Sequence, residues 1–197
     1  MFEWLRRKTE NTQRHSPTLD EPVVSLVASK VQQLDGLLQS IVSDVACELT
    51  LEYPHFSSTS VQRAEIGYFA LALLNYSVNQ FSGWSESSKR RICPQIIARV
   101  IGHLKAPNET LFTAQAKFLM RMETFYQFCV PRLFDDDLTD EGAATALSVP
   151  WSYMTTGEHL SVLEHLLYAT RSQRRMRYIL GMVREITTEI GDKLPLP

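Results

Sequence analysis

Hydrophobic residues along most of the chain recur at intervals of three and four positions, and rarely at intervals of two. This spacing places apolar side chains along one side of an α-helix, whereas a half-buried strand needs strict alternation. Only eight glycines and nine prolines interrupt the 197 residues, so long stretches contain no helix breaker. The pattern predicts an all-α bundle of about six or seven helices.

The most regular pattern lies in a predicted helix over 22–51. Asp20 is a suitable N-cap residue for it, and Pro22 suits its first turn. Leu37 and Val42 widen the apolar stripe beyond a narrow seam. Two interpretations stay open: a helix packed within an intramolecular bundle, or one that pairs with a second copy. The seam consists of seven residues in heptad spacing: Val24, Val27, Val31, Leu34, Leu38, Ile41 and Val45.

A second predicted helix, over 61–81, carries apolar residues around nearly its whole circumference. Such a helix has no face suited to water, so we expect it at the centre of the bundle. Asn75 and Tyr76 lie within this apolar run and need hydrogen-bond partners if they are buried.

The remaining chain continues the helical spacing with more frequent interruptions. Further helices are predicted at 92–104, 109–130, 139–147 and 156–190. Asn108 and Thr156 are expected as N-caps, and Pro150 is expected to stop the short helix at 139–147. The last helix has two apolar stripes in different directions, which predicts a break or a change of packing partner near Thr170–Ser172.

Composition and charge narrow the functional classes. Hydrophobic residues make up 44% and charged residues 21%, with a formal net charge of −2, so no global field attracts nucleic acid. Cys47, Cys93 and Cys129 are too far apart for a paired metal or redox motif and are expected to be reduced thiols. With no secretory signal or membrane span predicted, we expect a soluble cytoplasmic protein, with a flexible arm at 1–19 and one domain at 20–197.

An acidic segment follows the predicted helix at 109–130. Asp136, Asp137 and Asp140 form the string D-D-x-x-D, which resembles the aspartate-rich motif by which isoprenoid synthases hold magnesium and pyrophosphate. No second acidic metal motif accompanies it here. We therefore favour an acidic loop in which Asp137 or Asp140 caps the next helix, and we expect no metal and no cofactor. Cation binding at Asp135–Asp140 stays an open alternative.

The most concentrated charge is the basic cluster Arg171, Arg174, Arg175 and Arg177. An acidic protein surface or a phosphate group could bind it, although no helix-turn-helix pattern indicates specific DNA binding. The alternative is pairing with acidic residues of the same chain: Glu158, Glu164 and the Asp135–Asp137 loop.

No nucleophile elbow, phosphate loop or pair of metal-binding helices is found, so we expect a protein that is not an enzyme. The leading hypothesis is a helical interaction or regulatory module that binds a protein partner or itself, with a homodimer through the 22–51 helix as one form. The alternative is a small-molecule-binding or catalytic bundle with an apolar pocket between 61–81 and 109–130. Its candidate polar residues are Tyr68, Asn75, Tyr76, Glu123 and Tyr126.

Overall fold

A computed structural model describes residues 21–50, 60–105, 108–154 and 162–193. Within these ranges every regular element is an α-helix, which confirms the predicted all-α bundle. None of these helices has both the length and the apolar character needed to cross a membrane. The seven helices are α2 (Glu21–Thr50), α3 (Ser60–Phe81), α4 (Glu86–Leu104), α5 (Leu111–Phe128), α6 (Val130–Leu133), α7 (Asp140–Met154) and α8 (Val162–Lys193).

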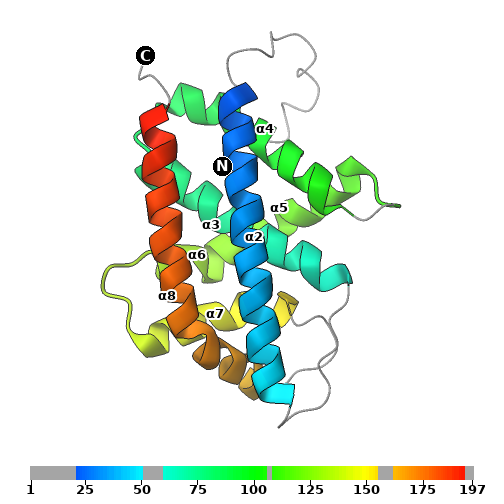
Figure 1. The fold of residues 1–197 in the computed structure, drawn as a ribbon, viewed down its shortest axis with the longest axis vertical. Coiled ribbons are helices and arrows are strands. Elements are labelled where there is room, and N and C mark those ends of the chain that lie inside the picture. Colours follow the sequence, from blue (N-terminus) through cyan, green and yellow to red (C-terminus); the bar gives the residue numbers. More distant parts are fainter. Residues whose placement is uncertain (1–20, 51–59, 106–107, 155–161, 194–197) are drawn as a thin grey trace.

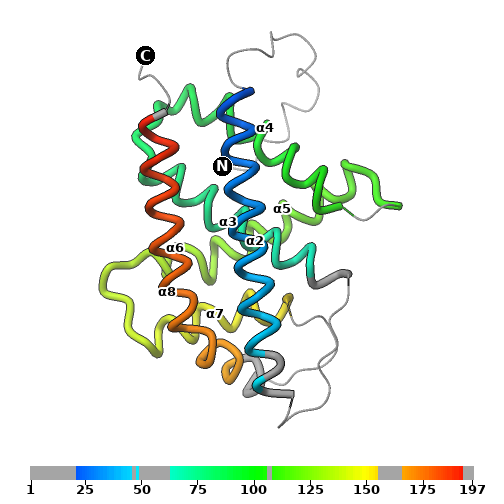
Figure 2. Tube along the Cα trace, in the orientation of Figure 1, coloured from blue at the N-terminus to red at the C-terminus, as the bar shows by residue number. Residues whose placement is uncertain are grey.

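The two longest helices, α2 and α8, lie side by side and run in opposite directions (Figures 1 and 2). Ion pairs join them near both ends. Lys30 Nζ lies 2.8 Å from Glu189 Oε2, and Arg175 Nη2 lies 2.6 Å from Glu48 Oε1. In the view of Figure 1, no described element covers the front of this pair, so the two helices present a long shared outer face.

Helix α3 crosses behind this pair and forms the centre of the bundle, as its apolar circumference predicts (Figure 1). Every residue from Glu65 to Leu74 is buried. On one side Phe69 packs edge-to-face against Phe125 of α5, with ring centroids 5.4 Å apart. On another side Thr187 of α8 donates a 2.8 Å hydrogen bond to Ser77, which satisfies two buried hydroxyls.

The heptad seam of α2 packs into the hydrophobic core of its own chain. Its seven residues are between 0% and 9% exposed. Val27 and Val31 border one small void together with Leu71 of α3 and Ile96 of α4. The expectation of a homodimer through this seam is therefore corrected, because a second copy could pack along its whole length only by displacing α3, α4 or α8.

Helix α7 is longer than the predicted helix at 139–147, because Pro150 does not stop it. The helix continues to Met154 although Pro150 cannot donate the usual backbone hydrogen bond. Tertiary packing outweighs this loss, since Trp151 is buried and its Nε1 donates a 2.8 Å hydrogen bond to Ser172 of α8. Burying an indole is worth roughly 3 kcal/mol or more, which is enough to offset one missing helical bond.

Helix α8 is continuous through Thr170–Ser172, so the predicted break is wrong and the alternative, a change of packing partner, is what the structure shows. Its first turns lie at an angle to the rest of the helix (Figure 1). There Tyr168 stacks on Trp151 of α7, with ring centroids 5.2 Å apart, whereas Thr187 further along contacts α3.

Two helix starts differ from those expected. Thr110, and not Asn108, caps α5 by accepting a 3.1 Å hydrogen bond from the Thr113 backbone amide. Ser85 caps α4 in the same way, so this helix begins at Glu86, well before Ile92, its first apolar residue. The expected caps Asp20 and Thr156 and the expected arm at 1–19 lie outside the described residues.

Candidate functional site

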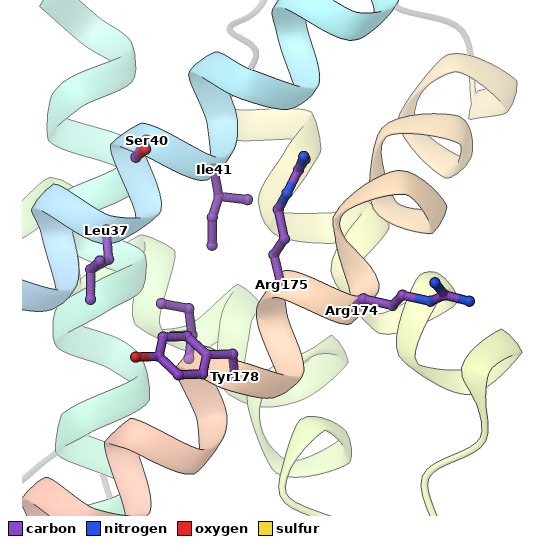
Figure 3. Close-up of a pocket in the computed structure, with 7 residues that line it drawn as sticks. Leu37, Ser40, Ile41, Arg174, Arg175 and Tyr178 are labelled. Atoms are coloured by element: carbon purple, nitrogen blue, oxygen red, sulfur yellow. The ribbon is translucent and has the colours of Figure 1, made fainter.

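A groove with a volume of about 390 Å³ lies between the middle of α2 and the middle of α8. Figure 3 shows Leu37 and Ile41 of α2 pointing toward α8, and the ring of Tyr178 reaching across toward α2. Its floor is apolar, and two arginines stand at one end. The lining residues are Leu37, Ser40, Ile41, Arg174, Arg175, Tyr178 and Ile179.

The groove remains open because Leu37 of α2 and Tyr178 of α8 do not fill the space between the two helices. Leu37 lies beside the heptad seam and is only partly covered by α8. Tyr178 is 66% exposed, so most of its ring remains in contact with water. An exposed tyrosine beside partly buried leucine is typical of a binding surface, because the ring combines an apolar body with a hydroxyl.

Two members of the basic cluster are paired within the chain. Arg175 donates a 2.6 Å hydrogen bond to Glu48 of α2, and Arg177 pairs with Asp140 at the start of α7. These two arginines therefore pair within the chain, but their partners, Glu48 and Asp140, are not the acidic residues expected from the sequence.

The other two members, Arg171 and Arg174, are exposed and form no ion pair with any residue that the structure describes. Arg174 extends outward from α8 on the side away from Arg175 (Figure 3). Arg174 lines the apolar groove, and Arg171 lies three residues before it in α8. The acidic candidates Glu158 and Glu164 lie outside the residues whose side chains are described.

The acidic loop is held against α8. Arg184 lies 3.2 Å from Asp136 and also donates to the Phe134 carbonyl oxygen. Thr139 caps α7 by accepting a 3.1 Å hydrogen bond from the Gly142 amide, so the expectation that Asp137 or Asp140 caps the helix is corrected. In the described parts of the chain no group of three or more acidic, histidine or cysteine residues is arranged to hold a metal ion.

The predicted pocket between α3 and α5 is filled by its own candidate residues. Tyr68 packs against Phe118, with ring centroids 5.6 Å apart, and burial raises its pKa to about 12. Asn75 donates a 2.8 Å hydrogen bond to the hydroxyl of Tyr126. Tyr76 packs edge-to-face on Tyr126, with ring centroids 5.6 Å apart.

The same region offers a ligand little space. Glu123 is exposed and does not join the other four candidates. The void that Asn75 borders has a volume of about 10 Å³, and it is lined by α2, α3 and α4 with no residue of α5, so it is not the expected pocket. The structure therefore corrects the expectation of an apolar pocket built by these five residues, because rings and one amide already occupy the interface.

The described thiols are poor nucleophiles. Cys93 and Cys129 are buried, and burial raises the pKa of Cys93 to about 11 and that of Cys129 further. Both are neutral thiols at physiological pH, whereas a cysteine nucleophile needs a lowered pKa. The thiol of Cys47 lies outside the described side chains.

The fold and the groove define a helical bundle with one open, partly basic face. No family model, curated protein or solved structure matches the chain significantly. A functional argument therefore rests on the chemistry of this face, because a helical bundle alone is compatible with many activities. Sequence reasoning named the arginines but missed Leu37 and Tyr178 as parts of the same site. The available signals were the position of Leu37 beside the seam and of Tyr178 directly after the basic cluster.

Proposed function

We propose that this protein is a non-enzymatic helical interaction module that binds an acidic helical segment on the outer face of α2 and α8. The observation that carries the proposal is the groove itself, where an apolar floor adjoins Arg174, which has no ion-pair partner among the described residues. Arg171, which also has none among them, lies three residues earlier in α8. A surface that combines an aromatic anchor, apolar neighbours and arginines has the composition of a protein-binding site.

The shape of the face favours a helix as the bound element. Two antiparallel helices with a groove between them can accept a third helix, whose apolar side chains insert at spacings of three and four. Leu37, Ile41 and Tyr178 would contact those side chains. The groove is open to solvent and lies on the outer face that α2 and α8 share, which suits a helix laid along that face.

Two glycines on this face support a close approach of the partner. Gly36 of α2 and Gly181 of α8 are exposed, and a Cβ atom added to either would meet nothing within 4 Å. Glycine within a helix costs about 1 kcal/mol relative to alanine, and no packing inside the described chain requires it at these positions. A partner backbone lying over them is a reason for their small size.

The charge of the face favours an acidic partner. Arg175 is already paired with Glu48, so Arg171 and Arg174 provide the available positive charge. Carboxylates on a bound helix would pair with both, at roughly 0.2–1 kcal/mol for each exposed pair. Such pairs also accelerate association at low ionic strength.

The proposal can be tested with a synthetic helical peptide that carries leucine along one face and glutamate beside it. Binding of the labelled peptide to the full chain would be followed by fluorescence anisotropy. We expect saturable binding that weakens with salt, and a matched peptide with glutamine in place of glutamate should bind less well. The double variant Arg171→Gln/Arg174→Gln should lower the affinity by roughly threefold to tenfold, which corresponds to the loss of two exposed pairs.

Matched controls separate this surface from general charge and exposed aromatic area. Arg63→Gln/Arg132→Gln removes two exposed arginines elsewhere and should leave binding unchanged. Tyr178→Ala should weaken binding, whereas Phe112→Ala, at an even more exposed ring on α5, should not. The proposal would be contradicted if Arg63→Gln/Arg132→Gln lowered the affinity for the peptide as much as Arg171→Gln/Arg174→Gln. It would also be contradicted if the chain bound a DNA oligonucleotide more tightly than the peptide.

A further inference from the structure

The outer surface of α8 carries a second heptad-spaced stripe, distinct from the residues that face the core. Its members follow one another at alternating steps of three and four, so they lie along one side of the helix. All six are exposed. They are Arg171, Arg174, Tyr178, Gly181, Glu185 and Thr188.

The order of these residues is self-complementary about the midpoint of the stripe. Tyr178 and Gly181 are equally far from that midpoint, and so are Arg174 and Glu185. If a second α8 lies antiparallel on the first, each tyrosine therefore faces a glycine and each arginine faces a glutamate. A twofold interface has this property, since the same surface patch must fit itself.

The facing residues are complementary in size, because a large side chain faces a glycine. Tyr178 projects an exposed ring, and Gly181 presents a backbone with nothing within 4 Å of an added Cβ. The ring of one copy can therefore lie on the helix backbone of the other without displacing a side chain. Because the pair occurs twice in a symmetric dimer, two such contacts flank the twofold axis.

The facing residues also have opposite charges. Arg174 and Glu185 form no ion pair with any described residue of their own chain, so both are available to a second copy. The neighbouring Arg175 and Arg177 are held by Glu48 and Asp140 and lie outside the stripe. The stripe thus places Arg174 and Glu185, neither of which has an ion-pair partner in the described part of the chain, at mirrored positions.

We infer that the helix bound by this face is α8 of a second copy, in an antiparallel, twofold-symmetric dimer in which Glu185 supplies the carboxylate. This inference rests on the proposed function, because it names the source of the carboxylate that Arg174 binds. The stripe spans about 27 Å of helix, and most of it is polar. Such a small polar interface gives a weak dimer that dissociates at high salt.

The test is sedimentation equilibrium of the full chain and of charge-exchange variants. The wild type should be in a concentration-dependent monomer–dimer equilibrium at low salt. Arg174→Glu and Glu185→Arg each place like charges opposite one another and should each weaken the dimer by about tenfold or more. The double variant Arg174→Glu/Glu185→Arg should recover the wild-type dimerisation, because every facing pair again has opposite charges.

A second variant checks the fit of the ring on the backbone. Gly181→Gln introduces a good helix former and fills the space over the backbone, so it should weaken the dimer without unfolding the monomer. Circular dichroism would verify the fold of each variant. A wild type that stays monomeric at high concentration, or a double variant no better than the single ones, overturns the inference.

The outcomes also separate this inference from the proposed function. If the chain stays monomeric but binds the acidic peptide, the second copy is the wrong partner and the interaction module stands. If charge exchange restores the dimer but the peptide does not bind, the face is specific for its own helix. If neither binds, both proposals fail.

Discussion

The same substitution, glycine to alanine, should have opposite effects at two positions ten residues apart in α8. At Gly181 the added methyl group meets nothing within 4 Å. Alanine should therefore stabilise the monomer by about 0.8–1 kcal/mol, the difference in helix propensity. At Gly191 the same methyl group would lie 2.5 Å from the carbonyl oxygen of Ser82, an atom of the backbone.

The cost at Gly191 follows from what has to move. A contact of 2.5 Å is well below van der Waals distance, and the turn that contains Ser82 is fixed by Gly83, which has a φ of 70°. Either this turn or the end of α8 must shift, at roughly 1–3 kcal/mol. Because Gly191 lies in the last turn of α8, little helix propensity is gained to offset this cost.

Thermal and urea unfolding of Gly181→Ala and Gly191→Ala would measure both changes. Each should be studied at low protein concentration, so that self-association does not contribute to stability. We expect the midpoint to rise for the first variant and fall for the second, by a few degrees in each case. A stabilising Gly191→Ala would refute the reasoning, because it would show that α8 does not pack against this turn.

Three further changes test the core. Glu65→Leu should destabilise the fold by roughly 2–4 kcal/mol in urea unfolding, because it leaves Arg121 without the carboxylate to which it donates at 2.8 and 3.0 Å. Thr187→Val should cost about 1–3 kcal/mol by leaving the Ser77 hydroxyl without this partner, and a double-mutant cycle with Ser77→Ala should show coupling. Burial raises the pKa of Asp35, so the folded state holds this proton more tightly than the unfolded chain and wild-type stability falls as pH rises through that raised pKa. Asp35→Asn should therefore have a higher free energy of unfolding than the wild type at neutral pH. This difference should vanish in unfolding curves recorded below the ordinary pKa of aspartate, and a difference that does not change with pH would contradict the reasoning.

The helices could be predicted from sequence because the apolar residues that recur at helical spacing are the ones buried in the structure. The seam of α2 and the apolar circumference of α3 are local patterns, and burial alone explains both. Pro150 shows where local rules fail, since Trp151 gains enough from packing on α8 to keep the helix intact. That gain depends on a contact between residues that are distant in the chain, which spacing does not reveal.

The candidate site could be predicted only in part, for the same reason. The arginine cluster can be identified in the sequence. Which of its members form ion pairs within the chain depends on where Glu48 and Asp140 lie in space. The groove depends on the antiparallel alignment of α2 with α8, which sets Leu37 opposite Tyr178. Alignment between two helices is a tertiary property, so neither residue could be assigned to a site from its own neighbours.

The central claim is that partners bind the outer face of α2 and α8. The most direct measurement is an NMR titration of the isotope-labelled full chain with the acidic helical peptide, read at the backbone amides. The account predicts shifts concentrated at Leu37, Ser40, Tyr178 and Gly181, with Phe112 and Met120 on α5 unaffected. Shifts concentrated on α5, or none at saturating peptide, would contradict it.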